Sequence, residues 1–146
     1  MTKDQKPKTI LILCTGNSCR SQMAEGFLKA FNKDLIVYSA GTKASKQVHP
    51  NAVKVMAELG VDLKNNYPKM VDKFLNVEFD YVISVCHHAK ENCPVFTGKV
   101  KKHLHIGFED PDELTGTEDE ILSEFRRIRD EILRDFFAFY QKEVIF

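Results

Sequence analysis

The sequence has no excess charge of either sign and no long hydrophobic run. Its Lys and Arg residues number 21 and its Asp and Glu residues also number 21, so the formal net charge is zero. This balance gives no electrostatic reason to expect a nucleic acid or an anionic membrane surface as a partner. No apolar stretch approaches the length of a membrane-spanning helix, and the polar residues 1–8 are not followed by the hydrophobic region of a secretion signal. We therefore expect a cytoplasmic protein.

Internal repeats, linkers and low-complexity segments are also lacking. The 146 residues, 43% of them hydrophobic, are enough for one domain with a substantial core and too few for two ordinary domains. We therefore predict a single domain over residues 1–146, in which residues 1–8 form a flexible N-terminal segment.

Short apolar runs alternate with segments of helical periodicity, a pattern typical of a parallel sheet covered on both faces. The sequence predicts strands over residues 9–13, 35–38, 79–85 and 100–108, and helices over residues 23–31, 50–59 and 118–141. The expected fold class is α/β, a three-layer sandwich with a four-stranded parallel sheet and helices on both faces. Because parallel strands bring their carboxyl ends to one ligand-binding edge, we expect Cys14, Cys86 and Asp110 to share a rim.

One segment, Cys14-Thr15-Gly16-Asn17-Ser18-Cys19-Arg20-Ser21, joins the first predicted strand to the first predicted helix. A glycine-containing loop that opens a helix directs several backbone N–H groups and the positive end of the helix dipole at one point, which favours an oxyanion. Helix N-termini and nearby arginines also stabilise thiolates, so we predict that Cys14 is a nucleophile. The predicted oxyanion-binding residues are Thr15, Gly16, Asn17, Ser18, Cys19, Arg20 and Ser21.

Within this loop, the residue types predict separate tasks. Gly16 permits close backbone approach, Asn17 holds the loop through its side chain, and Ser21 donates to the Cys14 thiolate. Cys19 is expected to be a buried, small apolar side chain without chemistry.

Asp110 stands before Pro111, a pair that is often a simple turn. At the same sheet edge as Cys14, however, a carboxyl group could donate a proton to the oxygen that leaves an oxyanion centre. The residues alone leave both interpretations open, a turn and a general acid.

Cysteines and histidines gather in Cys86-His87-His88-Ala89-Lys90-Glu91-Asn92-Cys93, which could be a surface helix, a zinc site or a redox pair. Neither cysteine pair has the short gap of common zinc motifs, so no metal site is predicted. In an intact helix the two thiols would lie about 10 Å apart, beyond the roughly 4.4–6.8 Å that a disulfide requires. A bond that needs local unwinding is a labile, reversible disulfide.

Taken together, these residues resemble the arsenate reductases that are built on the low-molecular-weight tyrosine phosphatase fold and recycled by thioredoxin. The resemblance rests on residues 14–26, 38–41 and 124–132, on Asp110-Pro111, and on the spacing of Cys86 and Cys93. It implies that Cys14 attacks arsenate held by the loop and Arg20, that Asp110 protonates the leaving oxygen, and that Cys86 releases arsenite. Cys93 would then resolve the disulfide for reduction by thioredoxin, with no cofactor; phosphate or sulfate could also occupy the loop.

Two rival functions share the anion loop. One is a low-molecular-weight tyrosine phosphatase that acts through a Cys14 phosphoenzyme, but such enzymes typically carry aromatic residues after Asp-Pro, where this chain has Asp112-Glu113-Leu114. The other is an inactive oxyanion-binding sensor, which would need only the cradle. Some arsenate reductases also bind potassium, at positions matching Asn17, Glu25 and Ser39, but Lys69 replaces an expected aspartate, so we expect no potassium site.

Overall fold

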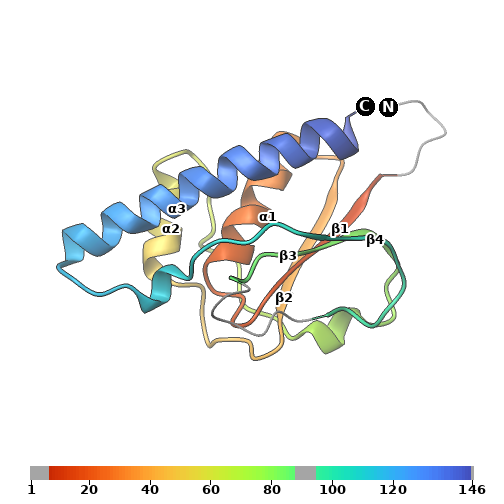
Figure 1. Cartoon of the computed structure of the whole chain (residues 1–146), viewed down its shortest axis with the longest axis horizontal. Helices are drawn as coiled ribbons and strands as arrows, with labels where there is room; N and C mark the ends of the chain where they lie inside the picture. Colours follow the sequence, from red (N-terminus) through yellow and green to blue (C-terminus); the bar gives the residue numbers. More distant parts are fainter. Residues whose placement is uncertain (1–6, 88–94, 146) are drawn as a thin grey trace.

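A parallel sheet forms the centre of the computed structural model, which describes residues 7–87 and 95–145 (Figure 1). Within those residues the sheet has four strands, in the spatial order β2-β1-β3-β4. Their bounds are Thr9–Cys14 for β1, Ile36–Gly41 for β2, Phe79–Ser84 for β3 and Val100–His105 for β4. The register places Leu13 of β1 beside Ala40 of β2 and Ser84 of β3, so the carboxyl ends of these three strands lie together.

Helices α1 (Arg20–Phe31), α2 (Pro50–Ala57) and α3 (Glu118–Phe139) share one hydrophobic core on one face of the sheet. Figure 1 shows α3 lying lengthwise across α1 and α2. The other face is covered by a smaller cluster that includes Phe74 of the short 3-10 helix η1 (Val71–Phe74). The predicted α/β sandwich is therefore confirmed, and the helix that the described residues place on its second face is a single 3-10 turn.

Strand β1 is buried on both faces, which explains its unbroken apolar sequence. Ile10 and Ile12 belong to the core under the helices, whereas Leu11 and Leu13 belong to the cluster on the opposite face. All four side chains are at most 1% exposed. This central position fixes the strand end from which the Cys14 loop departs.

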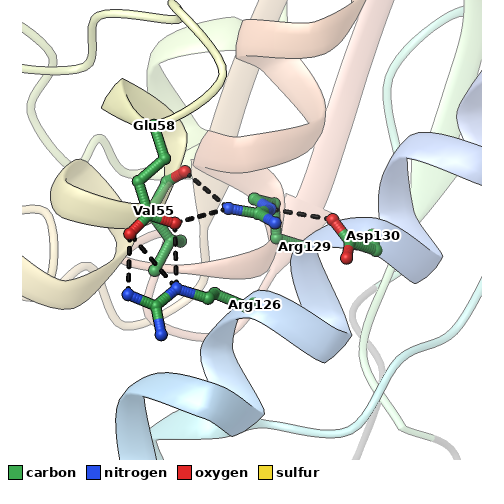
Figure 2. Close-up of polar contacts among 5 residues, drawn as sticks. All are labelled: Val55, Glu58, Arg126, Arg129 and Asp130. Carbon is green, nitrogen blue, oxygen red and sulfur yellow. Dashed lines mark hydrogen bonds and ion pairs between the residues drawn. The ribbon is translucent and has the colours of Figure 1, made fainter. Parts of the chain in front are cut away.

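The C-terminal end of α2 is fastened to α3 by a group of charged side chains (Figure 2). Arg129, which is 7% exposed, donates to the Val55 carbonyl (3.0 Å) and to the Glu58 carboxylate (2.8 Å). Arg126 binds both oxygens of Glu58. The hydrogen bond from Arg126 contributes most to lowering the pKa of Glu58 to about 2, and the bond from Arg129 lowers it further.

Helix α3 begins where the sequence places it. Thr117 and Glu120 form a reciprocal capping box, which satisfies two backbone N–H groups at the start of the helix. After Phe139 the chain continues as a π turn, η3 (Tyr140–Val144). No helix in the described residues is long and apolar enough to cross a membrane.

Several element ends differ from the sequence predictions by one to three residues, and two of these differences have a visible structural reason. Helix α2 ends at Ala57 rather than at residue 59, because the chain turns through Gly60, whose φ of +78° favours glycine. Strand β4 ends at His105 rather than at residue 108, yet Ile106 and Phe108 still donate backbone hydrogen bonds to the end of β3. The segment that follows β4 therefore stays against the sheet edge up to Phe108.

Candidate active site

A cavity of about 600 Å³ opens at the carboxyl edge of the sheet, over the loop between β1 and α1. The loop supplies its floor, the segment after β2 supplies one wall, and the 3-10 turn η2 (Pro111–Glu113) with the preceding aspartate supplies another. The lining residues are residues 14–20 together with Thr42, Lys43, Ser45, Asp110, Asp112 and Glu113.

The carbonyl groups of the loop are held by the segment that follows β2. The carbonyl oxygens of Thr15, Gly16 and Ser18 accept backbone hydrogen bonds of 2.8–3.0 Å from three residues within 43–49. Gly41 makes this approach possible, because a Cβ atom there would lie 2.3 Å from the Thr15 oxygen. Backbone contacts with a distant segment therefore fix the shape of the loop.

The backbone N–H groups of the loop are left available to a ligand. Among the residues that the structure describes, no acceptor is found for the N–H groups of Gly16 and Ser18. Cys19, the N-cap residue of α1, makes no side-chain capping hydrogen bond, so no cap of this kind occupies the N–H groups of the first turn. Donors of this kind next to the positive end of a helix dipole are what an oxyanion requires.

A chain of hydrogen bonds orients the hydroxyl group beside the Cys14 sulfur. The backbone N–H of Lys69 donates to Asn17 Oδ1 (2.9 Å), which turns the Asn17 Nδ2 group toward Ser21 Oγ (2.7 Å). Because Ser21 Oγ accepts this bond, its own proton can be donated to Cys14 Sγ, 2.9 Å away. The Asn17 backbone N–H also donates to Cys14 Sγ (3.1 Å). Two donors therefore converge on the sulfur, an arrangement that stabilises an anionic acceptor.

Asn17 also has the one positive φ (53°) among the described non-glycine residues, in the left-handed region that asparagine tolerates. Its side chain is fully buried and is held further by Gln22 Nε2, which donates to Asn17 Oδ1 (3.2 Å). The loop conformation and the orientation of Ser21 thus depend on the same asparagine.

Arg20 connects the loop to the opposite wall of the cavity. Its side chain is 4% exposed, its Nη1 donates to the Phe108 carbonyl (3.1 Å), and its Nη2 lies 3.6 Å from Asp110 Oδ2. Asp110 is the N-cap of η2 and accepts from the Asp112 backbone N–H (3.0 Å). The structure therefore brings Cys14, Arg20 and Asp110 to one cavity, as the strand order predicts.

Cys19 also lines the cavity, but its thiol is not set up to act as a nucleophile. Its side chain is 4% exposed, and burial raises the pKa of Cys19 to about 12 despite a hydrogen bond with Ser18. At neutral pH the Cys19 thiol therefore stays protonated. This agrees with the expected role of a small buried side chain.

Cys86 lies outside the cavity lining, beside the end of β1. The register pairs Leu13 with Ser84, and the Val85 backbone N–H donates to the Leu13 carbonyl (2.9 Å), so Cys86 follows directly at the shared strand edge. Cys86 is fully buried and disulfide-bonded, whereas Cys14 and Cys19 are free thiols. Cys93, the third predicted redox cysteine, lies outside the described residues.

Asn17, Glu25 and Ser39, which match potassium ligands in some arsenate reductases, form hydrogen bonds with other residues of the chain. Glu25, which is 4% exposed, accepts hydrogen bonds from Ser39 Oγ (2.6 Å) and Lys29 Nζ (2.7 Å). Burial lowers the pKa of Lys69, an effect partly offset by the nearby Glu25 carboxylate. The Glu25 carboxylate is therefore paired with Lys29 and lies close enough to Lys69 to affect its pKa. No group of three or more metal-ligating side chains occurs in the described part of the chain.

The wall formed by residues 42–49 is the part of the site that the sequence did not predict. Thr42, Lys43 and Ser45 follow β2 in a segment without regular structure, and no motif marks them. His49 follows this wall without lining the cavity, and its only sequence signal is its place before Pro50, where a helix begins.

The sequence matches the family described as low molecular weight phosphotyrosine protein phosphatase over residues 9–144. Over 126 residues it is 48% identical to the arsenate reductase of Halalkalibacterium halodurans, covering 86% of this chain and 89% of that protein. The arsenate reductase of Bacillus subtilis is 46% identical, and the match again covers 86% of this chain and 89% of that protein. A solved structure of an arsenate reductase in the phosphate binding state has a TM-score of 0.76 at 32% identity, covering 92% of this chain and 98% of that one.

Proposed function

Since the chain belongs to the low molecular weight phosphotyrosine protein phosphatase family and groups with its arsenate reductases, we propose that it reduces arsenate to arsenite at Cys14. The observation that carries this proposal is the cavity floor, where the Cys14 sulfur, unpaired loop amides and the Arg20 guanidinium meet. The similar structure of an arsenate reductase in a phosphate binding state supports a tetrahedral oxyanion as the ligand. The substrate would be held by N–H groups and one buried cation.

In the first step, the Cys14 thiolate attacks the arsenic atom and one oxygen leaves. Asp110, 3.6 Å from Arg20 in the free protein, protonates this oxygen so that it departs as water. The loop amides and Arg20 hold the remaining negative oxygens through this displacement. The product is a covalent Cys14–arsenic(V) adduct.

In the second step, the Cys86 thiolate attacks the Cys14 sulfur. The sulfur–arsenic bond breaks, its electron pair stays with arsenic, and arsenite leaves as a Cys14–Cys86 disulfide forms. Support comes from the strand register, which puts the two cysteines at neighbouring strand ends. The disulfide-bonded state of Cys86 also supports a redox role for this residue.

In the third step, Cys93 attacks Cys86, frees Cys14 and leaves a Cys86–Cys93 disulfide. Thioredoxin then reduces this bond by thiol–disulfide exchange, which returns two electrons to the protein. This step rests on the spacing of the two cysteines and on the resemblance, because Cys93 lies outside the described residues.

The second candidate function is phosphatase activity through a Cys14 phosphoenzyme, and the family match favours it as a side reaction. The cavity wall argues against phosphotyrosine as the main substrate, because Asp112 and Glu113 line the space beside Asp110. Their carboxylates would repel a phosphopeptide and offer no aromatic contact to its ring. An oxyanion sensor is disfavoured because it has no use for Asp110 or for a redox cysteine.

The test is arsenate-dependent consumption of NADPH coupled through thioredoxin and thioredoxin reductase. Cys86→Ser should abolish this turnover and leave slow hydrolysis of aryl phosphates by Cys14, whereas Cys93→Ser should stop after about one turnover. Cys19→Ala is the matched control, because it removes a cysteine that the relay does not use. Zero arsenate turnover by the wild-type protein together with rapid aryl phosphate hydrolysis would overturn the proposal and favour the phosphatase.

A further inference from the structure

His49 connects the floor of the cavity to the wall formed by η2, two parts that are far apart in the sequence. Its backbone N–H donates to the Ser18 carbonyl of the anion loop (3.0 Å). Its side-chain Nε2 lies 3.2 Å from Asp112 Oδ1, in the turn that carries Asp110. Both contacts are made by one residue, so the anion loop and the η2 turn are held at a fixed separation.

The contacts of the imidazole ring determine which nitrogen carries the proton. His49 is the N-cap residue of α2, and its Nδ1 accepts the backbone N–H of Asn51 (3.0 Å). A ring nitrogen that accepts a backbone N–H carries no proton, so Nε2 is the donor and points at the Asp112 carboxylate. The Phe125 ring, 4.8 Å away between centroids, packs against the imidazole and limits its rotation.

Asp112 in turn holds the side chain of Asp110 through a hydrogen bond. The Asp112 backbone N–H donates to Asp110 Oδ1 (3.0 Å), and the side chain of Asp112 is 59% exposed apart from its contact with His49. An exposed aspartate in a three-residue turn has little else to fix it. The Asp110 carboxyl group is thus held on one oxygen by Arg20 and on the other by the path from His49 through Asp112.

We propose that His49 is a positioning residue for Asp110, which holds the η2 turn so that the Asp110 carboxyl group faces the leaving oxygen of the substrate. This inference rests on the proposed function, in which Asp110 is the proton donor. His49 does not touch the substrate in this arrangement. Its role lies in the Nε2 contact with Asp112, separate from its role as the cap of α2.

Two substitutions separate these roles, because the asparagine amide takes the place of Nδ1 and the glutamine amide reaches the place of Nε2. His49→Asn keeps a good N-cap for α2 but is too short to reach Asp112. His49→Gln loses the favourable cap but can still donate to Asp112. His49→Asn should therefore keep thermal stability and lose rate, whereas His49→Gln should lose stability and keep rate. A merely structural role predicts that rate follows stability in both variants.

The readout is the rate constant of arsenite formation when fully reduced protein, freed of external thiols, is mixed with arsenate for a single turnover. General acid catalysis contributes about 10²–10⁴-fold, so Asp110→Asn should lose that much and His49→Asn about tenfold. Asp112→Asn should match His49→Asn, and the double variant should be no slower than either single one. The dissociation constant for inorganic phosphate should stay unchanged. His103→Asn, a change to an exposed histidine on β4, is the control.

Each result has a distinct meaning. If Asp110→Asn slows the reaction but His49→Asn does not, this inference is wrong and the proposed function stands. If His49→Asn weakens phosphate binding by the same factor as the rate, the His49 side chain acts on anion binding and not on Asp110, and the inference is also wrong. If the wild-type protein forms no arsenite, the proposed function fails and the inference falls with it.

Discussion

Replacing Ser21 with alanine tests the hydrogen-bond chain that ends on the Cys14 sulfur. Ser21 is fully buried and its hydroxyl lies 2.9 Å from Cys14 Sγ, with its proton directed there by the bond from Asn17. A hydrogen bond to a charged group is worth about 1.5–3 kcal/mol. At 1.36 kcal/mol for each factor of ten, its loss should slow the reaction of the Cys14 sulfur with an electrophile by up to about 10- to 150-fold.

The assay is alkylation of Cys14 by iodoacetamide at a series of pH values, with the modified peptide counted by mass spectrometry so that the other cysteines do not interfere. At neutral pH, alkylation of Ser21→Ala should be slower than alkylation of the wild-type protein by up to the factor given above, because the sulfur has lost a donor that stabilises its negative charge. Ser39→Ala is the matched control, because it removes an equally buried hydroxyl that donates to Glu25 (2.6 Å) and not to a cysteine. Equal alkylation rates for Ser21→Ala and Ser39→Ala would refute the reasoning.

Three further predictions concern the frame of the site. Gly41→Ala should deform the anion loop, because its Cβ would lie 2.3 Å from the Thr15 oxygen; phosphate affinity measured by calorimetry should fall at least about tenfold. Glu58→Gln should lower the free energy of unfolding at neutral pH, and the difference from wild type should vanish as pH falls from 4.5 to about 2, since Arg126 holds the folded pKa below its ordinary value; urea titrations at each pH measure this. Cys19 should resist iodoacetamide in the native protein at pH 7, because its pKa is about 12, and should react once urea unfolds the chain.

Local patterns predicted the strand, loop and helix that carry Cys14, since each depends on neighbouring residues. The apolar run of β1 and the loop up to Arg20 give the cradle, and parallel strand ends give the shared rim with Asp110. The strand β1 could be predicted because it is buried on both faces. A strand covered on both faces has an unbroken apolar sequence instead of alternating polar and apolar residues.

The remaining wall of the site could not be predicted because it depends on contacts between distant backbones. Residues 43–49 bind the loop through main-chain hydrogen bonds, which any residue type except proline can donate. His49 gave a signal only for a helix start, while its contact with Asp112 joins residues that are far apart in the sequence. Likewise, the orientation of Ser21 depends on the backbone of Lys69, which no spacing rule connects to it.

The uncapped start of α1 has a thermodynamic consequence for the whole protein. N–H groups that no side-chain cap occupies can be satisfied by an oxyanion, and such a ligand binds the native chain and has no matching site on the unfolded one. Binding of this kind adds about 2.7 kcal/mol to the unfolding free energy at a ligand concentration one hundred times the dissociation constant. A phosphate buffer that protects the fold against heat therefore competes with arsenate to the same degree. Melting temperature and inhibition become two measures of one equilibrium.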